Sequence, residues 1–135
     1  MNRETIVEII IGARSAVSPE ENEEAVKEAL AEYLKTEKRD AAYRRIISEY
    51  GADPQIDVAI EEMSELIKAL LKLRRVHKKG DCNARLECRK AIIDELADVS
   101  IMIRQMEILF QAEEETDKRI DTKIVRQLKR LEGDI

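Results

Sequence analysis

Two short acidic patterns are the part of this sequence best suited to chemistry. They are EEMSE at Glu61–Glu65 and ELAD at Glu95–Asp98. Carboxylates three or four residues apart share one side of a helix, where like charges repel unless a cation lies among them. If the two helices pack antiparallel, four carboxylates can converge, from Glu62, Glu65, Glu95 and Asp98. Such an all-oxygen set suits Mg²⁺, with Mn²⁺ as a possible substitute.

Apolar residues recur at helical spacing around both patterns. The first stripe is Ile56, Ile60, Met63, Ile67 and Leu70. The second stripe is Ile92, Leu96, Val99, Ile103, Met106 and Phe110. Glu62 falls at the edge of the first stripe, widened by Leu66 and Leu73, and Glu95 lies within about 60° of the centre of the second. A carboxylate so near a buried stripe is costly unless it is paired or bound to a metal. A solvated acidic face is the alternative explanation.

The elements that must position these residues are all predicted to be helices. Pro19 and Pro54 each stand where a helix should begin, with Ser18 and Asp53 as caps. Gly51 suits the end of a helix, and residues 80–83 form the clearest internal loop. The predicted helices cover residues 3–13, 19–34, 39–50, 54–77, 84–112 and 116–131.

The resulting fold prediction is an all-α, four-helix-type bundle with extra N-terminal helices. Residues 1–50 form a helical extension and residues 51–135 the domain with the acidic patterns, and the two are expected to make one compact unit. The wide apolar faces of the two long helices need more cover than one short chain supplies, which predicts a homodimer or homotetramer.

Composition agrees with this fold and excludes several classes of function. The chain has 135 residues, 39% of them charged, with only four Gly and two Pro, a balance that favours helix. A net charge of −5 and 3% aromatic residues do not fit general nucleic-acid binding. No apolar run reaches bilayer length, and Met1–Ala13 lacks the basic start of a signal peptide. We therefore expect a cytoplasmic protein with neither nucleic acid nor a membrane as partner.

Two other metal chemistries fit the sequence poorly. A zinc site at His77, Cys82 and Cys88 would need a fourth ligand and a tighter cysteine spacing. A di-iron carboxylate bundle needs Glu-x-x-His patterns, and no Glu precedes the single histidine by three residues.

Residues 50 to 132 resemble the all-α nucleoside triphosphate pyrophosphohydrolases, the MazG-like superfamily, in its small phage and bacterial form. The family pattern is E-E-x-x-E on one helix followed by E-x-x-D on the next, matched here by Glu61–Glu65 and Glu95–Asp98. Gln55 upstream and the basic stretch at 118–131 also look like the family. The span of residues 66–94 between the patterns is at the long end of the family's range.

The resemblance implies Mg²⁺-dependent hydrolysis of NTP or dNTP to NMP or dNMP and pyrophosphate, with a role in cleaning the nucleotide pool. Within the superfamily, alternative substrates are dUTP, dUDP and phosphoribosyl-ATP. By this resemblance, Glu61 is a further ligand or orients the attacking water, and the metal ligands are Glu62, Glu65, Glu95 and Asp98.

Substrate contacts are expected from basic residues and from two residues near the patterns. The phosphate-binding candidates are Lys68, Lys72, Lys118, Lys123, Arg126 and Arg130. Gln55 can hydrogen-bond a base edge, and Met102 can pack on a base or belong to the core. A solvated side chain is the alternative for each cation. For the whole chain, the rival hypothesis is a non-catalytic helical interaction protein whose acidic faces contact a basic partner.

Overall fold

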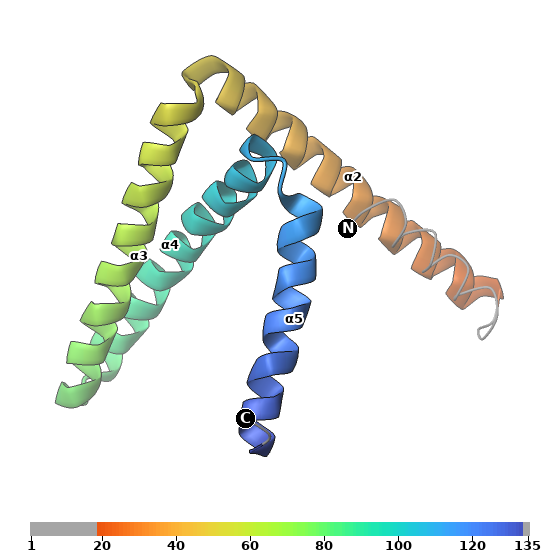
Figure 1. Ribbon diagram of the computed structural model, residues 1–135. Coiled ribbons are helices and arrows are strands. Elements are labelled where there is room, and N and C mark those ends of the chain that lie inside the picture. The colour runs from red at the N-terminus through yellow and green to blue at the C-terminus, as the bar shows by residue number, and fades with distance from the viewer. Residues whose placement is uncertain (1–18, 134–135) are drawn as a thin grey trace. The chain divides into compact units, whose positions relative to one another are not determined.

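The computed structural model describes residues 19–133, and within that range the chain is entirely helical and contains no strand (Figure 1). The helices are α2 (Pro19–Tyr50), α3 (Ala52–Lys79), α4 (Cys82–Leu109) and α5 (Glu113–Glu132). The predicted all-α fold is confirmed. The helix predicted at residues 3–13 and the cap predicted at Ser18 lie outside the described residues. None of the described helices is both long and apolar enough to span a bilayer.

The chain divides into two compact units, Met1–Arg45 and Ile46–Ile135. Helices α3, α4 and α5 all belong to the second unit, so both acidic patterns lie within it.

Helix α2 is a single helix where two were predicted, at 19–34 and 39–50. The intervening residues 35–38 read Lys-Thr-Glu-Lys and contain neither Gly nor Pro. The hydroxyl of Thr36 donates to the carbonyl oxygen of Glu32 at 3.0 Å, a bond compatible with continuous helix. A break here would leave backbone groups without partners at two new helix ends, so the helix continues.

A glycine separates α2 from α3. Gly51 has φ of 91° and donates its backbone N–H to the carbonyl oxygen of Ile47 at 2.9 Å, which ends α2 as predicted. Helix α3 begins at Ala52, directly after it, so Asp53 lies in the first turn and is not the predicted cap. An acid in the first turn still interacts favourably with the helix dipole.

A tight turn folds α4 back against α3. Gly80, with φ of 70°, ends α3, and the Oδ1 atom of Asp81 caps α4 by accepting from the backbone N–H of Ala84 at 3.1 Å. The two helices then lie side by side as an antiparallel hairpin (Figure 1). Their buried residues are few and mostly small or polar: Gln55, Ala59, Cys88, Val99, Met102 and Gln105.

The face of α3 that packs differs from its predicted apolar stripe, whereas the predicted stripe on α4 is covered in part, at Val99. Ile60 and Ile67 on α3 are 63% and 57% exposed, and Phe110, just after α4, is 64% exposed. The helices instead meet along the flank that carries Ala59 and Met102, where small side chains allow close approach. The exposed residues of the two stripes, such as Ile67 on α3 and Ile103 on α4, are turned from this contact in the same sense, so they lie on one side of the antiparallel hairpin.

Helix α5 has much less contact with the rest of its unit. It follows a turn in which Gln111 has φ of 51°, and among the described helices it packs only against α4. The guanidinium of Arg104 lies 2.8 Å from a carboxylate oxygen of Glu113 and ties the start of α5 to α4. No residue of α5 is buried.

The Asp81 cap gives a test of the hairpin turn. Asp81→Ala removes the acceptor for the N–H of Ala84 and should lower the free energy of unfolding by about 1 kcal/mol, whereas Asp81→Asn keeps an acceptor and should lose much less. Urea denaturation followed by circular dichroism measures both. Equal losses in the two variants would show that the cap does not stabilise the turn.

Candidate metal centre

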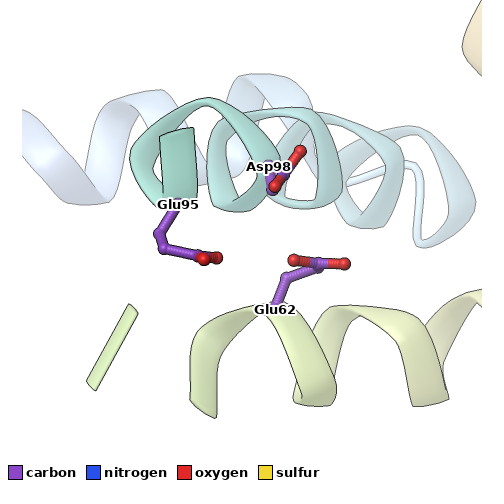
Figure 2. Close-up of side chains that lie close together, drawn as sticks. All are labelled: Glu62, Glu95 and Asp98. Atoms are coloured by element: carbon purple, nitrogen blue, oxygen red, sulfur yellow. The ribbon is translucent and has the colours of Figure 1, made fainter. Parts of the chain in front are cut away.

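Three carboxylates from two different helices converge in the middle of the hairpin. Figure 2 shows Glu62 extending from α3 toward α4 and Glu95 extending from α4 toward α3, with Asp98 on the same helix as Glu95. One oxygen from each carboxylate can be chosen so that all three lie within 4.8 Å of one another. Two of the three side chains are half-buried, those of Glu62 and Glu95, and Asp98 is exposed.

The helical spacing explains this convergence. Glu95 and Asp98 are three residues apart and therefore share one side of α4. Glu62 is three residues after Ala59, which is buried against α4, so its side chain points into the same contact. The rotation of α3 that leaves Ile60 and Ile67 exposed is thus also what points Glu62 toward the acids of α4.

The charges of the cluster perturb Glu62. Partial burial raises the pKa of the Glu62 carboxyl above its ordinary value, and the neighbouring carboxylates of Asp98 and Glu95 raise that pKa further. Glu61 and Glu65 add smaller contributions in the same direction. Every charged group that shifts the pKa of Glu62 is an acid, so these neighbours supply no positive charge to neutralise the site.

The donor set fits a hard divalent cation. Among the described residues, none of the three carboxylates forms an ion pair with Lys or Arg, so their oxygens are available to a ligand. Mg²⁺ is commonly bound in proteins by one or two carboxylates, with water and substrate phosphate as its other ligands. The three carboxylates could supply the protein ligands of such an ion.

The two remaining acids of the first pattern lie beside this cluster and not in it. Glu65 is one turn after Glu62, half-buried, and its Oε1 atom lies 2.9 Å from the Nζ of Lys68. Glu61 is exposed, and its carbonyl oxygen accepts from the hydroxyl of Ser64 at 2.7 Å. The structure thus brings together three of the four predicted ligands and leaves Glu65 paired with a lysine.

The predicted substrate residues are not gathered in one place. Lys72 is exposed on α3, two turns after Glu65. Lys118 is paired with Glu114 at 2.9 Å, which raises the pKa of the lysine. Helix α5 diverges from the hairpin after its first turns (Figure 1), so the structure does not bring its exposed side chains to the carboxylates; these are Lys118, Lys123, Arg126 and Arg130.

A second polar feature lies further along the hairpin. Gln55 and Met102 are buried, at 6% and 4% exposure. Gln105, which sequence reasoning missed, is 2% exposed, and its Oε1 atom has no hydrogen-bond partner among the described residues. The antiparallel register places Gln55 and Gln105 at the same level, about 10 Å from the carboxylates. The place of Gln105 could have been inferred from its spacing to Asp98 and Met102, because the three residues lie on one side of α4.

Comparison with known proteins gives no match. No protein-family model matches the chain, and neither does any curated protein or solved structure.

The negative charge of Glu62 is predicted to have two opposite effects. It lowers the stability of the ion-free protein, and it is required for stabilisation by Mg²⁺. Because its pKa is raised in the folded state, the folded chain binds a proton there more tightly than the unfolded chain does. Without divalent ions, stability should therefore fall as pH rises from the ordinary carboxyl pKa through the raised one. Glu62→Gln should remove this part of the pH dependence and raise the melting temperature at pH 7, while abolishing stabilisation by Mg²⁺.

Thermal melts between pH 4 and 7, with and without Mg²⁺, measure these effects. Asp57→Asn is the control, since Asp57 is an exposed acid of the same helix outside the cluster. A Glu62→Gln variant that is less stable than the parent at pH 7 and still stabilised by Mg²⁺ would contradict this account of the site.

Proposed function

We propose that the protein is a Mg²⁺-dependent nucleoside triphosphate pyrophosphohydrolase whose metal ligands come from α3 and α4. The observation that carries the proposal is the convergence of Glu62, Glu95 and Asp98 within 4.8 Å across two helices. The resemblance of EEMSE and ELAD to the MazG-like patterns gives the reaction class. Glu65, one turn from Glu62, is a fourth ligand if it exchanges Lys68 for the ion.

The proposed reaction is attack of water on the α-phosphorus. The new P–O bond forms from the water oxygen, the bond from the α-phosphorus to the bridging oxygen breaks, and NMP, pyrophosphate and protons are released. A bound Mg²⁺ supplies neutralisation of phosphate charge and activation of water. The carboxylates hold the ion, and Glu61 orients the water and accepts its proton.

The remaining substrate contacts follow from what lies near the carboxylates. Lys68 and Lys72 are on α3 within a few turns of Glu62, so they are better placed for phosphate than the cations of α5. Gln55 and Gln105 have side-chain amides that can hydrogen-bond a base. The Oε1 atom of Gln105 accepts no hydrogen bond from the described residues, so a donor on the base could satisfy it. The proposed role is removal of unwanted nucleotides. We propose that the protein acts in the cytoplasm as a homo-oligomer.

The decisive test measures pyrophosphate and monophosphate from a panel of canonical and modified NTPs and dNTPs. We expect release that requires Mg²⁺ and a fall of kcat by about 100-fold or more in Glu95→Gln, because the variant loses a charged ligand. Circular dichroism should show unchanged helix content in this variant.

Glu87→Gln is the matched control for this experiment. Glu87 is on the same helix, is exposed, and pairs with Lys90 at 3.1 Å outside the carboxylate cluster, so its removal should leave turnover unchanged. Turnover that survives in Glu95→Gln would remove Glu95 from the site. No turnover on any nucleotide, together with no response to divalent ions, would instead favour the non-catalytic interaction protein with acidic faces.

A further inference from the structure

Charge is divided sharply along the α3–α4 hairpin. Residues 68–90, which include the closed end at Gly80 (Figure 1), contain nine Lys or Arg and two Asp or Glu. Residues 51–67 contain five acids and no Lys or Arg, and residues 91–117 contain eight acids and one Arg. The closed end is therefore strongly basic, although the whole chain has a net charge of −5 and does not fit general nucleic-acid binding.

Most of these cations have no acidic partner. Both acids of residues 68–90 are engaged already, since Asp81 caps α4 and Glu87 pairs with Lys90 at 3.1 Å. We call the unpaired cations the basic tip; its six exposed residues, which form no ion pair within residues 19–133, are Lys72, Arg74, Arg75, Lys78, Lys79 and Arg89. The helix dipole favours only cations in the last turn of α3, so most of the basic tip needs another source of negative charge.

The spacing of these cations fits an extended anion. Lys72, Arg75 and Lys79 share one flank of α3 over about 10 Å, because they are three and four residues apart. Arg74 and Lys78, four residues apart, share the other flank. A single small anion cannot contact all of them, whereas a phosphate backbone presents a negative charge about every 3.4 Å along each strand.

The side chains at the closed end distinguish between classes of partner. Residues 77–85 contain no large apolar side chain. A protein partner needs an apolar or aromatic interface core, and a membrane-surface segment inserts apolar side chains among the lipids, so both are poor fits. Residues 68–90 also contain no Phe, Tyr or Trp on which the bases of a single strand could stack. A duplex recognised through its phosphates requires neither feature.

We infer that the basic tip binds the phosphate backbone of double-stranded nucleic acid without sequence preference. A duplex carries one negative charge about every 1.7 Å along its axis. Two helices side by side are roughly 20 Å wide and do not enter a major groove about 12 Å wide, so the tip contacts phosphates and not base edges. Repulsion between the duplex and the acidic remainder of the hairpin confines the contact to the closed end.

This binding does not depend on the proposed hydrolysis. Lys72 and Lys79 lie about 15 and 25 Å along α3 from Glu62, so the duplex and a metal ion at the carboxylates occupy different parts of the hairpin. Glu95→Gln, which should abolish turnover, should bind the duplex as the parent does. A failure of the hydrolysis assay and a failure of duplex binding are therefore separate results.

Fluorescence anisotropy of the full chain with a labelled DNA duplex of about 20 base pairs tests the inference. EDTA is present, so that no metal ion links the carboxylates to phosphate. Contact with about four phosphates predicts that log Kd rises with log salt concentration with a slope of about 3.6. Arg75→Gln/Lys79→Gln should lower this slope by about 1.8 and raise Kd at least about 10-fold at about 50 mM salt, because two phosphate contacts are lost.

Lys35→Gln/Lys38→Gln is the matched control, since it removes the same charge from exposed residues of α2 outside the hairpin. Its slope should equal that of the parent, and its Kd should change by less than about 2-fold, which separates local contact from the effect of net charge. Three results would each overturn the inference: no duplex binding by the parent at low salt, equal losses in the two double variants, or tighter binding to phosphatidylserine vesicles than to the duplex. The last result would assign the basic tip to a membrane surface.

Discussion

The antiparallel contact between α3 and α4 is the interaction on which the rest of the described structure depends. Glu62 is on one helix and its two partners are on the other, so no site exists unless the turn at Gly80 brings the helices together. The contact itself is thin, because its core contains small residues such as Ala59 and Cys88. Close approach of the helices is what lets short carboxylate side chains meet.

That contact works against electrostatic repulsion. Partial burial and the nearby carboxylates of Asp98 and Glu95 disfavour the charged form of Glu62, and among the described residues no basic side chain forms an ion pair with the three acids. A bound divalent cation would neutralise the three carboxylates and so stabilise the contact between the helices. A phosphate substrate would complete the coordination of the ion. The same packing leaves apolar residues such as Ile60 and Ile67 exposed on the other side of the hairpin.

The sequence predicted the helical fold because Gly51 and Gly80 mark where helices end and Pro54 lies in the first turn of α3. It predicted the pairing of the acidic patterns because the Gly80 loop requires an antiparallel return. It predicted part of the covered side of α4, at Val99, but not which side of α3 is covered. Apolar periodicity identifies a face that needs burial, but the choice between Ala59 and Ile60 as the contact depends on what packs there. The position of α5 and the burial of Gln105 depend likewise on contacts between elements.

Manganese binding followed by electron paramagnetic resonance tests most directly the claim that α3 and α4 together hold a divalent cation. Titration of the full chain should show Mn²⁺ bound to each chain, and Asp98→Asn should weaken the affinity by at least about 10-fold with helix content unchanged. Undiminished binding by Asp98→Asn, or no binding by the parent chain, would contradict the assignment of the three carboxylates as a metal centre.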